Sequence, residues 1–223
     1  MTQTLPKILT ETLITFEDFV KLETGDKRYE LHSGLLVEVA QPIGEHENVT
    51  GFLSTKITVE FDRLKLPYFL GSNVLVKPYG KDSGFLPDVL VLNKGNLANE
   101  PFYRKESTIS QSATIPLVIE VVSTAVATTG GTPATRCLTN WQDDYALKFD
   151  EYSDIGIPEY WIIDYLGLGG KEFIGSPKKP TFTQCELVNG QYVRNSLKSG
   201  AIQSKAFPEL NLTVEQIFNA AAF

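Results

Sequence analysis

The chain has 223 residues, 42% of them hydrophobic and 21% charged, and its formal net charge is −7. This length suits one substantial hydrophobic core and is short for two, which predicts a single domain spanning residues 1–223. The acidic balance argues against a protein that coats nucleic acid through bulk electrostatics. No apolar run approaches the roughly 18 residues needed to span a bilayer, and the N-terminus lacks a signal-peptide pattern, which predicts a cytoplasmic location without membrane contact.

The first elements read as a short helix followed by a hairpin. Thr15–Asp18 resembles a capping box, with the helix continuing to about Glu23. Apolar residues then alternate along Tyr29–His32 and along Leu35–Val39, on either side of Ser33-Gly34. This pattern is typical of a two-residue β-hairpin.

The next stretch predicts a long helix and then a strand. Apolar residues recur at helical spacing between His46 and about Leu64, so one face of this helix should be buried. We expect residues 68–70 and 73–77 to form the strand that precedes Asp88, and residues 95–115 to be largely loop.

Two apolar runs each carry one carboxylate. Phe85–Leu92 contains Asp88, and Pro116–Ser123 contains Glu120; both runs read as buried strands. An unpaired ionised carboxylate inside a protein costs several kcal/mol. Glu120 should therefore be paired, protonated or bound to a cation, and the same question arises for Asp88.

A helix that follows offers a partner for these carboxylates. Asp144, Lys148 and Tyr152 are spaced four residues apart and would share one helical face. Gly156–Pro158 should end this helix, and Glu159–Asp164 supplies another strand. The order strand, strand, helix, strand predicts a mixed sheet with a crossover helix.

The C-terminal part predicts a β-meander and a last helix. Short strands are expected at residues 171–174, 181–188 and 191–193, and Thr213–Gln216 is a capping box. Residues 125–139, between Glu120 and Lys148, are rich in Thr, Ala and Gly. They read as a flexible insertion near the site. Both cysteines are expected to be free thiols.

These motifs together resemble the Uma-type family of bacterial proteins classed as restriction endonucleases, within the PD-(D/E)XK nuclease superfamily. The resemblance rests on ordered motifs over most of the chain: Arg28–Leu31, Leu86–Val89, Val118–Ser123, Lys148, Tyr152, Gly156–Asp164 and Phe207–Leu210. It implies an α+β (α/β) fold of the restriction-endonuclease type. In that fold, helices flank a mixed central β-sheet, here with an N-terminal hairpin and a C-terminal meander.

The resemblance also implies a site and an activity. The superfamily places a lysine two residues after the strand glutamate, where this chain has Val122, which implies that Lys148 has taken that role from the helix. Asp88, Glu120 and Lys148 would then be catalytic. Mg²⁺ or Mn²⁺ would be held by Asp88, Glu120, the Val121 carbonyl and Glu30, with His46 and Tyr152 as accessory residues.

Burial should lower the pKa of Lys148 while the carboxylates raise it, and the residues alone do not decide which effect prevails. Lys148 would orient or deprotonate the attacking water, or stabilise negative charge. The expected substrate is DNA, cut by a homodimer with two active sites. A basic rim for the phosphate backbone could come from residues scattered along the chain: Lys77, Lys81, Lys94, Arg104, Lys105, Arg136, Lys178 and Lys179.

Other functions remain open at this point. Asp88, Glu120 and Lys148 could form a buried ion-pair network in a catalytically inactive nuclease-fold protein that binds nucleic acid or acts as an interaction scaffold. A glycosidase could use Asp88 and Glu120 as a carboxylate pair, but it would need neither Lys148 nor a metal.

Overall fold

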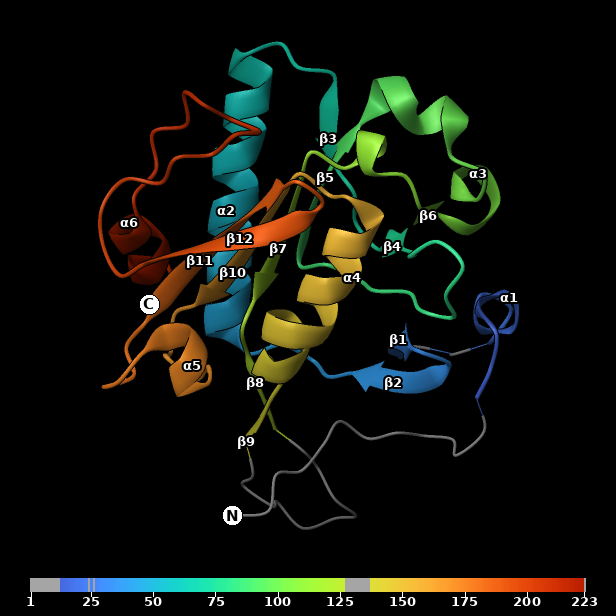
Figure 1. Ribbon diagram of the computed structural model, residues 1–223, viewed down its shortest axis with the longest axis horizontal. Coiled ribbons are helices and arrows are strands. Elements are labelled where there is room, and N and C mark those ends of the chain that lie inside the picture. Colours follow the sequence, from blue (N-terminus) through green and yellow to red (C-terminus); the bar gives the residue numbers. More distant parts are fainter. Residues whose placement is uncertain (1–12, 24, 26, 127–136, 223) are drawn as a thin grey trace.

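The computed structural model describes residues 13–23, 25, 27–126 and 137–222, and a six-stranded sheet lies at its centre (Figure 1). The strand order is β12-β11-β10-β7-β5-β3, and only β7 and β10 run parallel. The sheet is therefore mixed, as expected. Its strands are β3 (Tyr68–Leu70), β5 (Val89–Asn93), β7 (Leu117–Val121), β10 (Glu159–Asp164), β11 (Thr181–Val188) and β12 (Gln191–Leu197).

A helical crossover joins the two parallel strands, because parallel neighbours cannot be linked by a tight turn. It consists of a π-helical turn, η3 (Asp143–Leu147), and the α-helix α4 (Lys148–Ile155). Gly156 ends α4 at φ +86°, a left-handed conformation that glycine adopts without steric cost. The predicted crossover helix is confirmed.

Helices cover both faces of the sheet. In Figure 1, α4 lies in front of the sheet and α2 (Gly44–Arg63) lies behind it. Side chains alternate along β7, so Ile119 and Val121 pack in the cluster that contains α2 and α6 (Val214–Asn219), whereas Val118 packs in the cluster that contains α4. Glu120 must therefore face α4.

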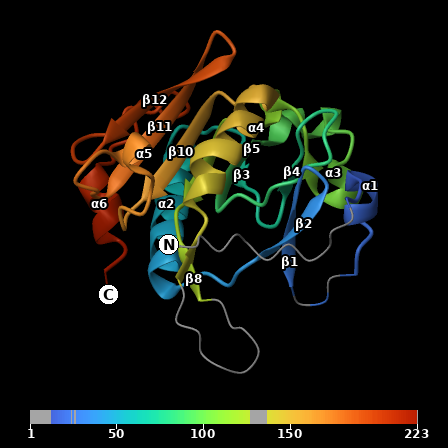
Figure 2. The ribbon, with the colours of Figure 1, turned by 60° about the horizontal axis from the view of Figure 1, so that its bottom comes forward.

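The hairpin forms as predicted and lies with α1 at one end of the molecule, away from α6 (Figure 2). Strands β1 (Arg28–His32) and β2 (Leu35–Val39) meet at Ser33 (φ 50°) and Gly34 (φ 85°), the positive angles that a two-residue hairpin turn requires. Helix α1 (Phe16–Phe19) is capped by Thr15 and ends earlier than expected. Leu31 exchanges two backbone hydrogen bonds with Gly84, which fixes β1 beside the segment before Asp88.

The region around β3 differs from the prediction of one strand over residues 68–77. Asn73 adopts φ 57°, which breaks the extended chain, and β4 (Leu75–Val76) leaves the main sheet. There it pairs in parallel with β6 (Thr108–Ile109).

The expectation of a loop over residues 95–115 is wrong, because this segment contains several short helical turns besides β6. The Asn93 side chain accepts a hydrogen bond from the Gly95 N–H and starts the first of them. The buried Glu100 carboxylate accepts the backbone N–H groups of Ser110 and Gln111. These turns are η1 (Lys94–Asn99), α3 (Tyr103–Glu106) and η2 (Ser112–Thr114).

The expected strand over residues 171–174 is also wrong, since α5 (Lys171–Ile174) is a helical turn. The Gly170 carbonyl accepts hydrogen bonds from the N–H groups of Phe173 and Ile174. The segment has two charged residues followed by two apolar ones, which is too short a pattern to distinguish a strand from a helical turn. The β11–β12 hairpin, which turns at Asn189 and Gly190, and the capping box of α6 are confirmed.

Part of the expected insertion over residues 125–139 lies outside the described residues, which exclude 127–136. Its two ends pair as an antiparallel ribbon, β8 (Thr124–Val126) with β9 (Cys137–Thr139). Next to the ribbon, the Asn140 side chain accepts the Ser123 N–H at 3.2 Å. Of the expected free thiols, Cys185 is free and buried. Among the helices described, none combines the length and the apolarity that crossing a membrane would require.

A buried carboxylate ties the C-terminal tail to the sheet. Glu159, at the start of β10, accepts hydrogen bonds from Trp161 Nε1, Gln184 Nε2, Ser204 Oγ and the Ala206 N–H, at 2.7–2.9 Å. Its exposed fraction is 0%. All four donors would lose this acceptor if the carboxylate were removed, and Gln184 Nε2 would keep its bond to the Gln203 carbonyl.

We therefore predict that Glu159→Ala lowers the free energy of unfolding by about 3–5 kcal/mol, because it leaves buried donors unpaired. Urea unfolding followed by tryptophan fluorescence measures the change. Glu186→Ala, which removes a partly exposed ion pair with Lys205, should cost about 1 kcal/mol or less. Equal losses in the two variants would contradict the structural role of Glu159.

Candidate active site

The sheet brings Asp88 and Glu120 to the same place. Asp88 immediately precedes β5, and Glu120 lies near the end of β7, which runs antiparallel to β5. Val89 is paired with Ile119. The Asp88 Oδ2 atom accepts the Val121 N–H at 2.7 Å. The structure thus brings Asp88, Glu120 and Val121 together at one edge of two adjacent strands, the placement that the sequence predicts.

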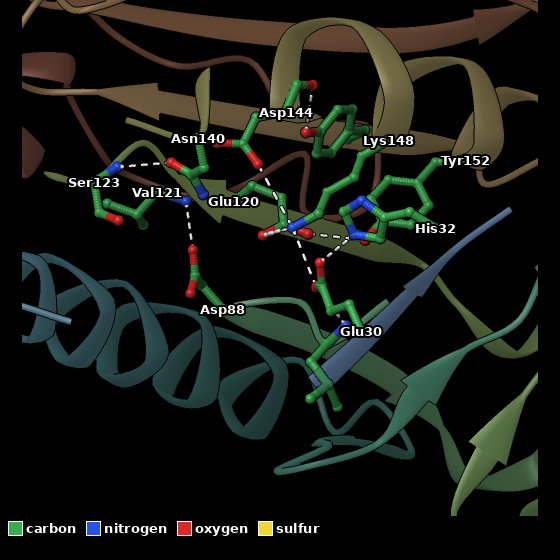
Figure 3. Close-up of polar contacts among 12 residues, drawn as sticks. Glu30, His32, Asp88, Glu120, Val121, Ser123, Asn140, Asp144, Lys148 and Tyr152 are labelled. Atoms are coloured by element: carbon green, nitrogen blue, oxygen red, sulfur yellow. Dashed lines mark hydrogen bonds and ion pairs between the residues drawn. The ribbon is translucent and has the colours of Figure 1, made fainter. Parts of the chain in front are cut away.

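Helix α4 directs two side chains at Glu120 (Figure 3). Lys148 Nζ lies 3.1 Å from Glu120 Oε2, and the Tyr152 hydroxyl donates to Glu120 Oε1 at 2.8 Å. All three side chains are buried. The helical spacing noted in the sequence therefore does supply the ammonium that Glu120 needs.

Glu30 reaches the same ammonium from β1. Its Oε1 atom accepts the Leu86 N–H at 2.9 Å and lies 3.4 Å from Lys148 Nζ, and its Oε2 atom lies 2.8 Å from His32 Nε2. Burial alone would raise the pKa of Glu30, but Lys148 and His32 outweigh it and lower this pKa to about 2. Glu30 is therefore ionised, and both of its oxygens are engaged.

Asp144 is a further carboxylate beside Lys148, with Oδ1 3.6 Å from Nζ. It is 0% exposed, and neither of its oxygens has a hydrogen-bond partner. Burial raises the pKa of Asp144 to about 7; Lys148 opposes this effect and Asp88 adds to it. The Tyr160 hydroxyl fixes the Asp144 backbone by donating to its carbonyl at 2.9 Å.

Carboxylates outnumber the cations in this cluster, where Glu30, Glu120, Asp144 and Asp88 all act on Lys148. Burial would lower the pKa of Lys148, but Glu120 and Glu30 outweigh it and raise this pKa well above its usual value. Burial, opposed by Lys148 and reinforced by Asp88, raises the pKa of Glu120. The question left open by the sequence is thus answered: Lys148 is an ammonium ion here.

His46, in the first turn of α2, lies against Asp88. Its Nε2 atom is 3.2 Å from Asp88 Oδ2, and its Nδ1 atom is 3.4 Å from Glu47 Oε1. Burial would lower the pKa of His46, but Asp88 and then Glu47 outweigh it and raise this pKa. The long helix α2 therefore places His46, which the sequence predicts as an accessory residue, beside Asp88.

Sequence reasoning missed the contact of His32 with Glu30 and gave Asp144 no role beyond its place on the helical face. His32 is two residues after Glu30 on β1, so the strand period of two puts both side chains on one face. The local spacing was thus visible. The burial of Asp144 without a hydrogen-bond partner was not visible, because it depends on β7 and β10 packing over the helix.

The donor set fits a hard divalent cation. Carboxylate oxygens are the ligands that Mg²⁺ and Mn²⁺ prefer. Four carboxyl groups act on Lys148, and the Asp144 oxygens lack hydrogen-bond partners. In the part of the chain that the structure describes, no three His, Cys, Asp or Glu side chains are already grouped closely enough to hold a metal. The ammonium of Lys148 lies between the carboxylates of Glu30, Glu120 and Asp144.

Two lysines of the expected basic rim, Lys77 and Lys81, form contacts within the protein. Lys77 is buried, and its ammonium lies 4.7 Å from the centre of the Phe16 ring. Lys81 pairs with Glu151 and Asp154 of α4, at 2.9 and 2.8 Å. Both lysines therefore stabilise the fold in this structure. Arg136, another expected member of the rim, lies outside the described residues.

A mixed sheet with helices on both faces, two carboxylates at adjacent strand ends and a lysine from the crossover helix define a restriction-endonuclease-like protein. A family model named Uma2 and described as "Putative restriction endonuclease" matches residues 16–215. The chain belongs to this family, as the resemblance in the sequence implies.

A solved structure supports the fold. The crystal structure of a "putative nuclease belonging to DUF820" from Anabaena variabilis matches with a TM-score of 0.64 and 15% identity, over 93% of this chain and 99% of that chain. At this identity the likeness concerns the fold. No curated protein matches the chain.

The raised pKa of Asp144 predicts how stability depends on pH in EDTA. A pKa of about 7 in the folded state, above the usual aspartate value of 3.8, means that the folded state holds the proton more tightly than the unfolded state, so this residue lowers stability as pH rises from about 4 to 7. Asp144→Asn cannot ionise and therefore does not lose this stability as pH rises. Its melting temperature should exceed that of the wild type by at least about 3 °C at pH 8, and by less at pH 5.

Differential scanning calorimetry at the two pH values measures this difference. Asp150→Asn, an exposed substitution on the same helix, should change the melting temperature by less than about 1 °C at both. A melting temperature of Asp144→Asn that falls relative to the wild type as pH rises would disprove the assignment.

Proposed function

We propose that this protein is a metal-dependent endonuclease that hydrolyses phosphodiester bonds of DNA. The observation that carries this proposal is the contact of Lys148 with Glu120 beside Asp88, at the ends of adjacent strands. Membership of the Uma2 family supports it. The proposal includes DNA as the substrate, Mg²⁺ or Mn²⁺ as the metal ion and the cytoplasm as the location.

Asp88 and Glu120 would hold Mg²⁺ or Mn²⁺, with the Val121 carbonyl as a neighbouring ligand. When bound, such an ion strengthens a water nucleophile and neutralises charge on the phosphate and the leaving oxygen. Glu30, also expected as a ligand, would join only by releasing one of the donors that its oxygens now hold.

Lys148 would stabilise negative charge that develops on the phosphate. Because the carboxylates keep its pKa well above the usual value, it is a poor base for removing a proton from water. Glu30 would position this ammonium, and His46 would position Asp88. Tyr152 would orient Glu120 through its hydroxyl.

The same contacts favour one alternative. Lys148 pairs with Glu30, Glu120 and Asp144, and such a closed network is what a catalytically inactive nuclease-fold protein that binds nucleic acid or acts as a scaffold would retain. Cleavage assays separate the two functions. A homodimer, which would provide one site for each strand, is a prediction for size-exclusion chromatography with light scattering.

We expect the wild type to cleave supercoiled plasmid or single-stranded DNA with Mg²⁺ or Mn²⁺ and to be inactive in EDTA. Asp88→Ala, Glu120→Ala and Lys148→Ala should each reduce the rate at least about 100-fold, because each removes charge at the reacting phosphate. Cleavage rates on both substrates, with circular dichroism to confirm folding, provide the measurement.

Asp62→Ala is the matched control, since this aspartate forms an exposed ion pair with Lys65 at the far end of α2. It should cleave at the wild-type rate. Absence of cleavage by the wild type on every substrate, with no rise of its melting temperature on adding metal, would move the assignment to the inactive scaffold.

Tyr152→Phe should lower kcat about 10-fold rather than abolish cleavage, because it removes one hydrogen bond to a charged group and keeps the ring. The ring contacts with Phe85 and Tyr160 should preserve the fold. Single-turnover cleavage with excess enzyme isolates the effect. A loss as large as that of Glu120→Ala would instead give the hydroxyl a direct part in the reaction.

A further inference from the structure

The Asp144 side chain is the unexplained group of this site. It is 0% exposed, and a buried carboxylate without hydrogen bonds costs several kcal/mol unless a cation compensates it. Its only ion pair among the described residues is with Lys148, at 3.6 Å, and that ammonium lies closer to Glu120 and Glu30. The present contacts therefore do not account for an ionised Asp144.

Geometry directs this carboxylate into the site. Asp144 and Lys148 are one helical turn apart, and Figure 3 shows the Asp144 carboxylate turned toward Lys148 and Glu120. The Tyr160 hydroxyl and Arg194 Nη2 bind the backbone carbonyls of Asp144 and Tyr145, at 2.9 and 2.7 Å. These two bonds anchor the π-helical turn, a feature that is frequent at functional sites.

Asp144 also differs from Glu30 in the number of hydrogen bonds that it would have to break to bind a cation. Both Glu30 oxygens already have donors, so moving this side chain would break existing hydrogen bonds. The Asp144 oxygens have none to break. Ligand distances of about 2.0–2.1 Å to Mg²⁺ are shorter than the 3.1–3.6 Å that now separate Lys148 Nζ from the carboxylates, so the carboxylates would close in and the ammonium would move aside.

We propose that Asp144 is a cation-binding carboxylate of this centre, which together with Glu120 receives a divalent metal ion at the position next to Lys148. This inference rests on the metal-dependent function proposed above and deepens it. It adds a ligand from the crossover helix to the strand carboxylates. It also makes the ammonium of Lys148 a competitor for the ion in the metal-free protein.

The test is isothermal titration calorimetry of Mn²⁺ into the metal-free full-length chain at pH 8, without DNA. Asp144→Asn should raise the Kd for Mn²⁺ at least about tenfold, because one charged ligand is lost. Asp144→Ser, measured in parallel, removes the same carboxylate and should give the same result. The exposed Asp150→Asn should bind Mn²⁺ within about twofold of the wild type.

A second variant tests the position of the ion. Lys148→Met removes the competing ammonium and should lower the Kd for Mn²⁺ severalfold. An unchanged Kd in this variant would place the ion elsewhere and overturn the inference. Calorimetric melting of each metal-free variant confirms that the protein titrated is folded.

Asp88→Asn separates failure of this inference from failure of the proposed function. If the wild type binds Mn²⁺, Asp88→Asn loses binding and Asp144→Asn keeps it, Asp144 is not a ligand and the proposed nuclease site stands. If the wild type binds no Mn²⁺ at all, both proposals fall. A tenfold loss in Asp144→Asn with binding retained by Asp150→Asn establishes the further ligand.

Discussion

The structure depends most on the buried ammonium of Lys148. Among the residues that the structure describes, only this ammonium pairs with all three of Glu30, Glu120 and Asp144, which come from β1, β7 and the crossover helix. Without it, an ionised Glu120 or Asp144 would be buried without its ion pair, at a cost of several kcal/mol each, whereas Glu30 would keep its contacts with His32 and the Leu86 N–H. The ion pairs of Lys148 therefore connect the β1–β2 hairpin, the central sheet and the crossover helix.

The same interaction sets the chemistry that the site can perform. Glu120 and Glu30 keep Lys148 protonated, and burial, reinforced by Asp88, raises the pKa of Glu120, so the cluster is rich in carboxyl groups and holds some of its protons tightly. A site of this kind attracts hard cations and suits a reaction in which negative charge develops on a phosphate. His46 and Val121 hold Asp88 at the edge of the cluster, where its side chain is 24% exposed and open to solvent.

Elements outside the cluster determine how accurately it is built. Gly84 and Leu31 fix β1 against the segment before Asp88, and Tyr160 and Arg194 hold the π-helical turn before Lys148. Glu159 anchors the tail on the opposite end of β10. Two lysines of the expected basic rim are already engaged near α4, since Lys77 is buried and Lys81 pairs with Glu151 and Asp154.

The sequence by itself determined the elements that have a local cause. The hairpin follows from Ser33-Gly34, the end of α4 from Gly156–Pro158, and the candidate residues Asp88, Glu120 and Lys148 from carboxylates and a lysine in otherwise apolar or helical patterns. Only the tertiary structure decided what depends on distant partners. Residues 171–174 form a helical turn that stacks Phe173 on Tyr145 and buries Ile174 in the core, contacts that the local sequence does not specify. The raised pKa of Lys148 comes from Glu120 and Glu30, which outweigh burial, and Asp144 is buried without hydrogen bonds. Both features arise only when strands and helices from remote parts of the chain close over the site.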